Sequence, residues 1–146
     1  MIFRKPSWML MLCFVRVTMS MTHASDSDGS DAGESFHFEY QISPILAKLG
    51  CSAAECHGGA TGQGGFKLSL FADNPLLDYQ AITEELGGRR IDYSDPPNSL
   101  VLRKPSRKGV KHEGGRILRS EDSGYQKIIK WIERGAPFTE GTPEFL

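Results

Sequence analysis

Apolar side chains recur at helical spacing in two segments, one at each end of the part of the chain that can fold. In residues 38–49 the apolar positions lie three and four residues apart, and Gly50 is a typical helix end. Pro44 fits this helix only near its start. A clearer stripe follows Ser120, which is expected to cap the last helix before Gly135 ends it. The stripe consists of Tyr125, Ile128, Ile129 and Ile132.

Shorter elements are expected between these two helices. Residues 66–71 alternate in polarity and predict a brief extended segment, and residues 78–86 predict a short helix. The turn at residues 95–99 can start a helical stretch that Pro105 ends. Without repeats or long strands, the pattern predicts one all-α domain of three to five helices with long irregular loops. Its apolar side chains are few, so something besides side chains is expected to fill the middle.

The first 24 residues have the pattern of an export signal. Arg4 and Lys5 precede an apolar run that ends at a small residue, Ala24. Arg16 interrupts this run, which is too short to span a membrane, so no stable insertion is expected after cleavage. Cys13 follows a bulky leucine, which argues against lipid attachment at that cysteine.

Composition divides the rest of the chain into three parts. Residues 25–35 are polar and acidic and predict a flexible tether, residues 36–140 form the foldable domain, and residues 141–146 are a tail. Removal of residues 1–24 leaves 14 basic against 18 acidic residues, a net charge of −4, which disfavours a nucleic-acid partner. It also removes every methionine.

The most informative motif is Gly50-Cys-Ser-Ala-Ala-Glu-Cys-His-Gly-Gly59. Two cysteines followed at once by a histidine are typical of c-type haem attachment, although the usual spacing between the cysteines is two residues and here it is four. The small residues after Cys51 allow the loop to bulge. A Cys51–Cys56 disulfide remains open in an oxidising compartment. A zinc site is the third alternative, although His37 and His112 each stand alone.

Five further segments accompany the cysteine motif: Gly64-Gly-Phe-Lys-Leu-Ser-Leu-Phe71, Gly88-Arg-Arg-Ile91, Pro97-Asn-Ser-Leu-Val-Leu-Arg-Lys-Pro105, Lys111-His-Glu-Gly-Gly115 and Trp131-Ile-Glu-Arg-Gly-Ala136. With these segments the chain resembles the cytochrome c-like domain of exported planctomycete proteins from about residue 38 to residue 138. The resemblance implies a haem c joined by thioether bonds to Cys51 and Cys56, with His57 as the proximal iron ligand.

The sixth iron ligand has to come from elsewhere in the chain. Related small cytochromes use a methionine in the loop before the last helix, and His112 occupies the corresponding loop here. We therefore expect bis-histidine ligation by His57 and His112. His37, a lysine or an open site are the alternatives. Four basic residues are candidates to pair with haem propionates or to lie on a solvated surface: Arg89, Arg90, Arg103 and Lys104.

The expected function is electron transfer by an exported, periplasmic or extracytoplasmic mono-haem cytochrome domain that works with a redox partner protein. Two alternatives remain. One is a haem-based sensing or binding module with a displaceable sixth ligand, and the other is a haem-free interaction domain closed by a disulfide. An enzyme in its own right is not expected, since no catalytic triad, carboxylate pair or nucleotide motif stands out.

Overall fold

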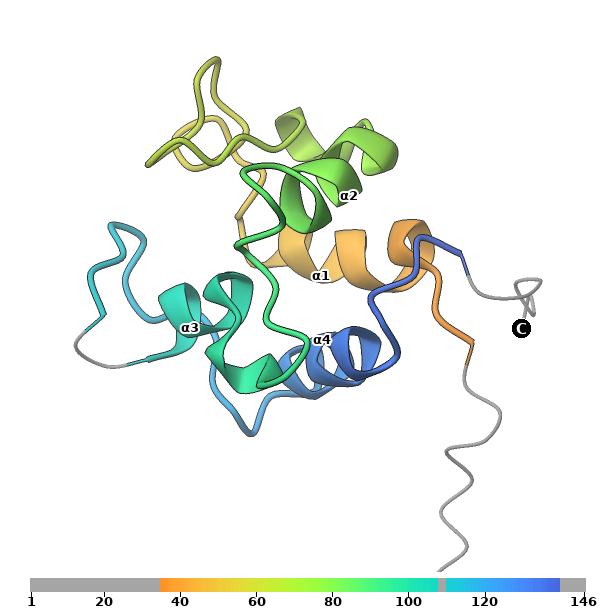
Figure 1. Cartoon of the computed structure of the whole chain (residues 1–146). Coiled ribbons are helices and arrows are strands. Elements are labelled where there is room, and N and C mark those ends of the chain that lie inside the picture. The colour runs from red at the N-terminus through yellow and green to blue at the C-terminus, as the bar shows by residue number, and fades with distance from the viewer. Residues whose placement is uncertain (1–34, 108–109, 140–146) are drawn as a thin grey trace, which may run out of the picture. The chain divides into compact units, whose positions relative to one another are not determined.

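The computed structural model describes residues 35–107 and 110–139, and these residues form an all-α unit (Figure 1). The expected export signal with Cys13, nearly all of the tether, and the C-terminal tail lie outside them. Isolated backbone bridges join His37 to Thr139 and Gln63 to Phe66, and no strand forms within the described ranges. The α-helices are α1 (Ser43–Lys48), α2 (Pro75–Thr83), α3 (Leu100–Ser106) and α4 (Ser123–Glu133), with shorter helical turns η1 (Phe38–Ile42), η2 (Leu70–Ala72) and η3 (Pro96–Asn98).

The first predicted helix is present in two parts. The π-helical turn η1 leads directly into α1, and Pro44 lies in the first turn of α1, where its missing N–H is not needed. Gly50 follows the helix with a φ of 77°, a left-handed conformation that suits glycine and stops the helix. The cysteine motif therefore begins at a sharply defined helix end.

The last helix confirms the predicted stripe but begins two residues later than expected, at Ser123 rather than Glu121. Tyr125, Ile128 and Ile132 are buried, and Trp131 joins them. The predicted cap by Ser120 is wrong, because its hydroxyl donates to the neighbouring Glu121 carboxylate. Asp122 precedes the helix instead, and its carboxylate accepts a hydrogen bond from the backbone N–H of Arg119 at 2.8 Å.

Three middle elements differ from expectation. Helix α2 begins at Pro75, because the side chain of Asn74 accepts the backbone N–H of Leu77 at 3.1 Å and caps the helix. Pro105 does not end α3, which continues through Ser106. The extended segment reaches only to Ser69, after which the chain enters η2.

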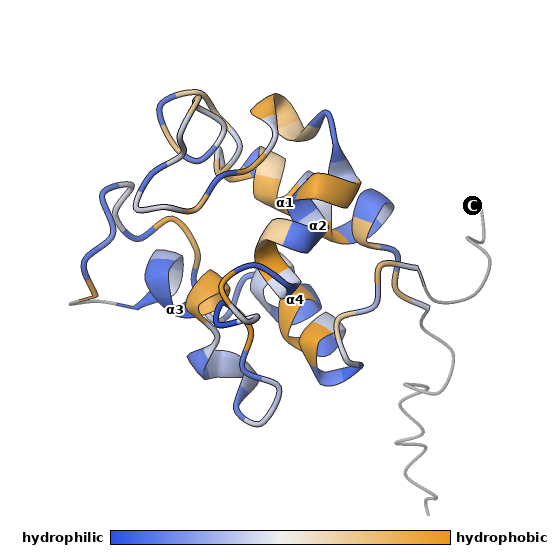
Figure 2. Cartoon of the chain, turned by 45° about the horizontal axis from the view of Figure 1, so that its top comes forward, coloured by the Kyte–Doolittle hydropathy of each residue, from blue (hydrophilic) through white to orange (hydrophobic). Residues whose placement is uncertain are grey.

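A core of side chains lies where α1, α2 and α4 meet, and α1 runs between the other two helices (Figure 1). The ring of Phe38 lies 5.5 Å from that of Tyr79, 5.6 Å from that of Trp131 and 6.3 Å from that of Phe138. This aromatic core, as we call these four residues, joins η1 to α2 and α4. Figure 2 shows that α4 is amphipathic, with one apolar face and one polar face. Side chains alone supply the core in this part of the unit.

None of the helices described is long and apolar enough to cross a membrane.

Candidate functional site

The cysteine motif folds as a tight loop fastened to the end of α1 by backbone hydrogen bonds. The N–H of Cys51 donates to Leu46 at 3.0 Å, and the N–H of His57 donates back to the carbonyl of Cys51 at 3.0 Å. Gly58 lies so close to this loop that an added Cβ would be 2.0 Å from the carbonyl oxygen of Ser52. The position of His57 is therefore set by close backbone packing, which only glycine at position 58 permits.

Both cysteines of the motif are free thiols and are partly exposed. Cys51 also packs against the buried core. Burial raises the pKa of the Cys51 thiol to about 11, and the nearby Cys56 acts in the same direction. Cys51 is consequently a protonated thiol at neutral pH, with its partner thiol close by.

His57 is held by Phe66, which contacts it in two ways. The Nδ1 atom of His57 lies 2.9 Å from the backbone carbonyl oxygen of Phe66, and the two rings are 4.6 Å apart between centroids. Burial lowers the pKa of His57, with His112 and Arg90 acting in the same direction and the carbonyls of Phe66 and Gln63 opposing them. The ring is therefore neutral at pH 7, and the carbonyl of Phe66 places its proton on Nδ1.

His112 comes from the loop between α3 and α4, 55 residues later in the chain, and reaches the same place. Its ring centroid lies 6.4 Å from that of His57, with 26° between the ring planes. The Nδ1 atom of His112 lies 2.8 Å from the carbonyl oxygen of Gly115, and the Gly115 N–H donates to the carbonyl of His112. The structure thus brings together the two histidines that the sequence singled out.

The hydrogen bonds of His57 and His112 use Nδ1 of each ring and leave Nε2 to act as a metal ligand. A histidine that donates Nδ1–H to a backbone carbonyl presents the lone pair of Nε2, which is how metal-binding histidines are commonly oriented. With metal–nitrogen bonds of about 2 Å, two imidazoles on opposite sides of one metal place their centroids roughly 6 Å apart. The observed centroid distance of 6.4 Å matches that spacing, so His57 and His112 are candidate donors to one iron.

His37, the other histidine considered for the sixth ligand, lies elsewhere. It precedes η1, whereas the cysteine motif follows α1, so the length of these consecutive helical segments, roughly 15 Å, separates the two ends. His37 is buried, and its Nε2 atom has no hydrogen-bond partner. The structure does not bring it to His57.

The basic residues considered as propionate partners differ from one another. Arg89 is exposed, whereas Arg90 is only 5 % exposed and its guanidinium is bonded to protein groups, so the solvated-surface alternative is wrong for Arg90. The Nε atom of Arg103 is buried without a partner. Lys104 donates to the carbonyl of Lys111 at 3.1 Å. Sequence reasoning missed the role of Phe66 as the residue that holds His57.

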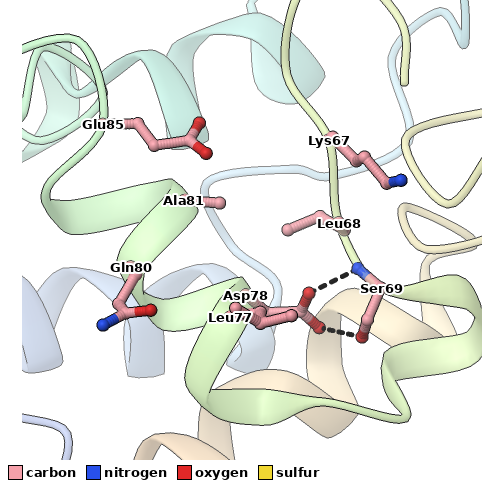
Figure 3. Close-up of a pocket in the computed structure, with 8 residues that line it drawn as sticks. All are labelled: Lys67, Leu68, Ser69, Leu77, Asp78, Gln80, Ala81 and Glu85. Carbon is pink, nitrogen blue, oxygen red and sulfur yellow. Dashed lines mark hydrogen bonds between the residues drawn. The ribbon is translucent and has the colours of Figure 1, made fainter. Parts of the chain in front are cut away.

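A pocket of about 320 Å³ lies outside the histidine pair, beside α2 (Figure 3). Two of its lining residues are bonded to each other. The buried carboxylate of Asp78 accepts hydrogen bonds from the backbone N–H of Ser69 at 2.5 Å and from the Ser69 hydroxyl at 2.9 Å. The pocket is lined by Lys67, Leu68, Ser69, Leu77, Asp78, Gln80, Ala81 and Glu85. Because this contact fastens residue 69 to α2 and no residue of the cysteine motif lines the cavity, we assign the pocket no chemistry.

Among the residues that the structure describes, no three His, Cys, Asp or Glu side chains gather as a ligand group for a bare metal ion. A zinc site of the usual kind needs four such ligands. Haem iron needs only two from the protein, because the porphyrin supplies the others.

Comparisons of the chain with protein-family models, with curated proteins and with solved structures give no match. The functional argument consequently rests on the residues and geometry described above.

Proposed function

We propose that this chain is an exported mono-haem c-type cytochrome domain that transfers electrons. In this proposal haem c is joined to the thiols of Cys51 and Cys56, and its iron is held by His57 and His112. The observation that carries the proposal is the histidine pair, whose rings are 6.4 Å apart with each Nδ1 next to a backbone carbonyl. When bound, a haem iron supplies one-electron oxidation and reduction.

The residues of the cysteine motif have separable roles. The thiols of Cys51 and Cys56 are close together on one loop, where each can add its S–H across a vinyl group without loss of atoms. His57 follows directly and is fixed in rotation by the Phe66 carbonyl. The motif therefore offers attachment and one ligand from a single rigid loop, despite its four-residue spacing.

A second protein ligand decides between electron transfer and binding chemistry. With His57 and His112 both bound to the iron, the protein would supply two ligands and leave no position for a substrate or a gas. Two imidazoles also omit the methionine that raises the potential of cytochromes c, so the reduction potential is expected to be lower than that of a methionine-ligated relative. A redox partner protein would then accept or deliver the electron at an exported location.

Intact mass and a visible spectrum test the attachment. The full chain is exported from a host that matures c-type cytochromes, and its mass is measured after denaturation. The expected result is the mass of the processed chain plus one whole haem, because thiol addition to a vinyl group releases nothing. A chain without haem and two hydrogens lighter than its free-thiol form would overturn the proposal in favour of the Cys51–Cys56 disulfide domain.

Substitution of His112 tests the second ligand. A His112→Ala variant should keep the covalent haem but change from a low-spin to a high-spin spectrum and gain carbon monoxide binding. The matched control is His37→Ala, which removes a histidine that lies away from the site and should keep the low-spin spectrum. If the parent itself binds carbon monoxide readily, the sixth position is displaceable and the sensing alternative replaces electron transfer.

A further inference from the structure

Arg90 is a buried cation whose two terminal guanidinium nitrogens, Nη1 and Nη2, are both hydrogen-bonded to other groups of the protein. Its Nη1 atom donates to the carbonyl of Ala81 at 2.6 Å and to the carboxylate of Glu85 at 3.2 Å, and its Nη2 atom donates to the carbonyl of Gly65 at 3.0 Å. Its guanidinium carbon lies 4.5 Å from the centroid of the Phe66 ring. Charged side chains are seldom buried to this extent unless they are fully bonded.

These contacts surround the residue that holds His57. Arg90 bonds the carbonyl of Gly65, in the peptide group just before Phe66, and covers the Phe66 ring. Phe66 in turn packs its ring against the imidazole of His57 and accepts the hydrogen bond from Nδ1. Arg90 therefore contacts both the peptide group before Phe66 and the Phe66 ring, and Phe66 contacts the His57 imidazole through its ring and its carbonyl.

We propose that Arg90 is a positioning residue for His57, acting through Phe66 to set the plane and the free nitrogen of the imidazole. The inference rests on the proposed function and assigns Arg90 no direct contact with the haem. A planar guanidinium is suited to this role, because it can bond two carbonyls in its plane while its face lies on an aromatic ring. A lysine at this position provides the charge but has neither the paired N–H donors nor the planar face of the guanidinium.

The position of the charge has a second consequence. The guanidinium carbon of Arg90 lies 4.5 Å from the centroid of the Phe66 ring, and that ring lies 4.6 Å from the imidazole of His57, so the charge is near the proposed iron ligand. A fixed positive charge in a poorly solvated place favours the state of the iron with the lower positive charge, which is the reduced state. Loss of the charge should therefore lower the reduction potential. Loss of the paired guanidinium donors should alter the orientation of the His57 imidazole.

The test compares Arg90→Gln and Arg90→Lys with Arg89→Gln in the haem-loaded full chain. Arg89 is the exposed neighbour, so its substitution removes the same charge at the surface. The readouts are the electron paramagnetic resonance g-values of the ferric protein, which report the orientation of the axial imidazoles, and the reduction potential. We expect both Arg90 variants to shift the g-values, only Arg90→Gln to lower the potential clearly, and Arg89→Gln to match the parent.

Each other outcome has a defined meaning. Parent g-values in both Arg90 variants would overturn the inference, and so would a fall in potential that Arg89→Gln reproduces in full. If Arg90→Gln does not accumulate as folded protein, the g-values of Arg90→Lys decide alone. A parent chain that carries no haem overturns the proposed function itself, whereas a haem-loaded parent with insensitive Arg90 variants overturns only the role of Arg90.

Discussion

The aromatic core and the histidine side of this domain are built in different ways. The aromatic core is held together by ring–ring contacts among its four side chains, Phe38, Tyr79, Trp131 and Phe138. On the histidine side, which we define as the loop of residues 50–66 with residues 111–115, the defining contacts are hydrogen bonds to backbone carbonyls and close approaches at glycine.

The difference shows what each region can tolerate. A core of rings depends on volume, because buried area and tight packing provide its stability. A loop that presents ring nitrogens depends on the path of its backbone, because the carbonyls that orient His57 and His112 belong to that backbone. Substitutions should therefore separate the two regions: changes of volume should unfold the first, and changes of backbone freedom should disorganise the second.

The largest effect is expected from Trp131→Ala. Trp131 is fully buried, touches Phe38, and donates its indole N–H to the carbonyl of Pro137 at 2.8 Å. Its truncation should lower the free energy of unfolding by about 3–5 kcal/mol, measured by urea denaturation of the folded chain. The control Tyr93→Ala removes a ring that is 54 % exposed and should cost less than about 1 kcal/mol. Equal losses in the two variants would contradict a volume-dependent core.

Gly58→Ala should act next most strongly and should affect the other region. The new Cβ would lie 2.0 Å from the Ser52 carbonyl, which also accepts the N–H of Phe71, so the loop has to move. We expect a loss of about 2–3 kcal/mol, with the near-ultraviolet signal of Trp131 retained.

The control in the same loop is Gly64→Asn. Gly64 has a φ of 62°, an added Cβ there would meet nothing within 4 Å, and asparagine tolerates this left-handed conformation better than most residues. The substitution should cost about 1 kcal/mol, the lower end of the range for a residue other than glycine in this conformation. A Gly58→Ala variant as stable as Gly64→Asn would show that the loop is not set by this close approach.

Asp78 is a buried acid of α2 outside both regions, and it should make stability depend on pH. Burial raises the pKa of Asp78, although the two hydrogen bonds from Ser69 oppose the shift. The change in stability with pH should therefore be smaller than the losses expected for Trp131→Ala and Gly58→Ala. An acid with a raised pKa binds its proton more tightly in the folded chain, so stability should fall as pH rises from the ordinary aspartate pKa of about 4 through the higher folded value. Urea denaturation across this range checks the slope. Asp78→Asn should reduce it, and an unchanged slope would assign it to other groups.

Glu85→Gln should give the smallest effect. Its carboxylate pairs with Arg90 at 3.2 Å, but the Glu85 side chain is 52 % exposed, so solvent weakens the pair. The loss should stay below about 1 kcal/mol in urea denaturation, because Arg90 keeps its bonds to Ala81 and Gly65. A loss similar to that of Gly58→Ala would mean that the ion pair, rather than the two carbonyls, holds Arg90 in place.

Local sequence signals predicted the regular parts of the fold well and their ends less well. The stripe of α4 was visible because its buried residues recur every three or four positions. Its start was misplaced because Ser120 and Asp122 both suit a cap, whereas in the structure the backbone is still extended at Asp122 and becomes helical only at Ser123. Pro105 was expected to end α3, but the helix accommodates it one residue before its last.

The candidate site was predictable as a set of residues and not as a geometry. Spacing and resemblance named Cys51, Cys56, His57 and His112, but nothing local to His112 shows that it lies beside His57. Arg89 and Arg90 are indistinguishable in sequence. Only the tertiary structure shows that the carbonyls of Gly65 and Ala81, distant in the chain, bond the second arginine and bury it.

The separation of His57 and His112 along the chain gives their pairing a thermodynamic consequence. The proposed haem bonds to Cys51, Cys56 and His57 would all fall within seven consecutive residues, so they would scarcely constrain the unfolded polypeptide. A bond from the same iron to His112 would instead close a loop of 55 residues. By the loop-entropy relation used for disulfides, such a closure is worth roughly 4 kcal/mol. In the proposed cytochrome, the sixth ligand would therefore also be a cross-link that holds the α3–α4 connection to the rest of the domain.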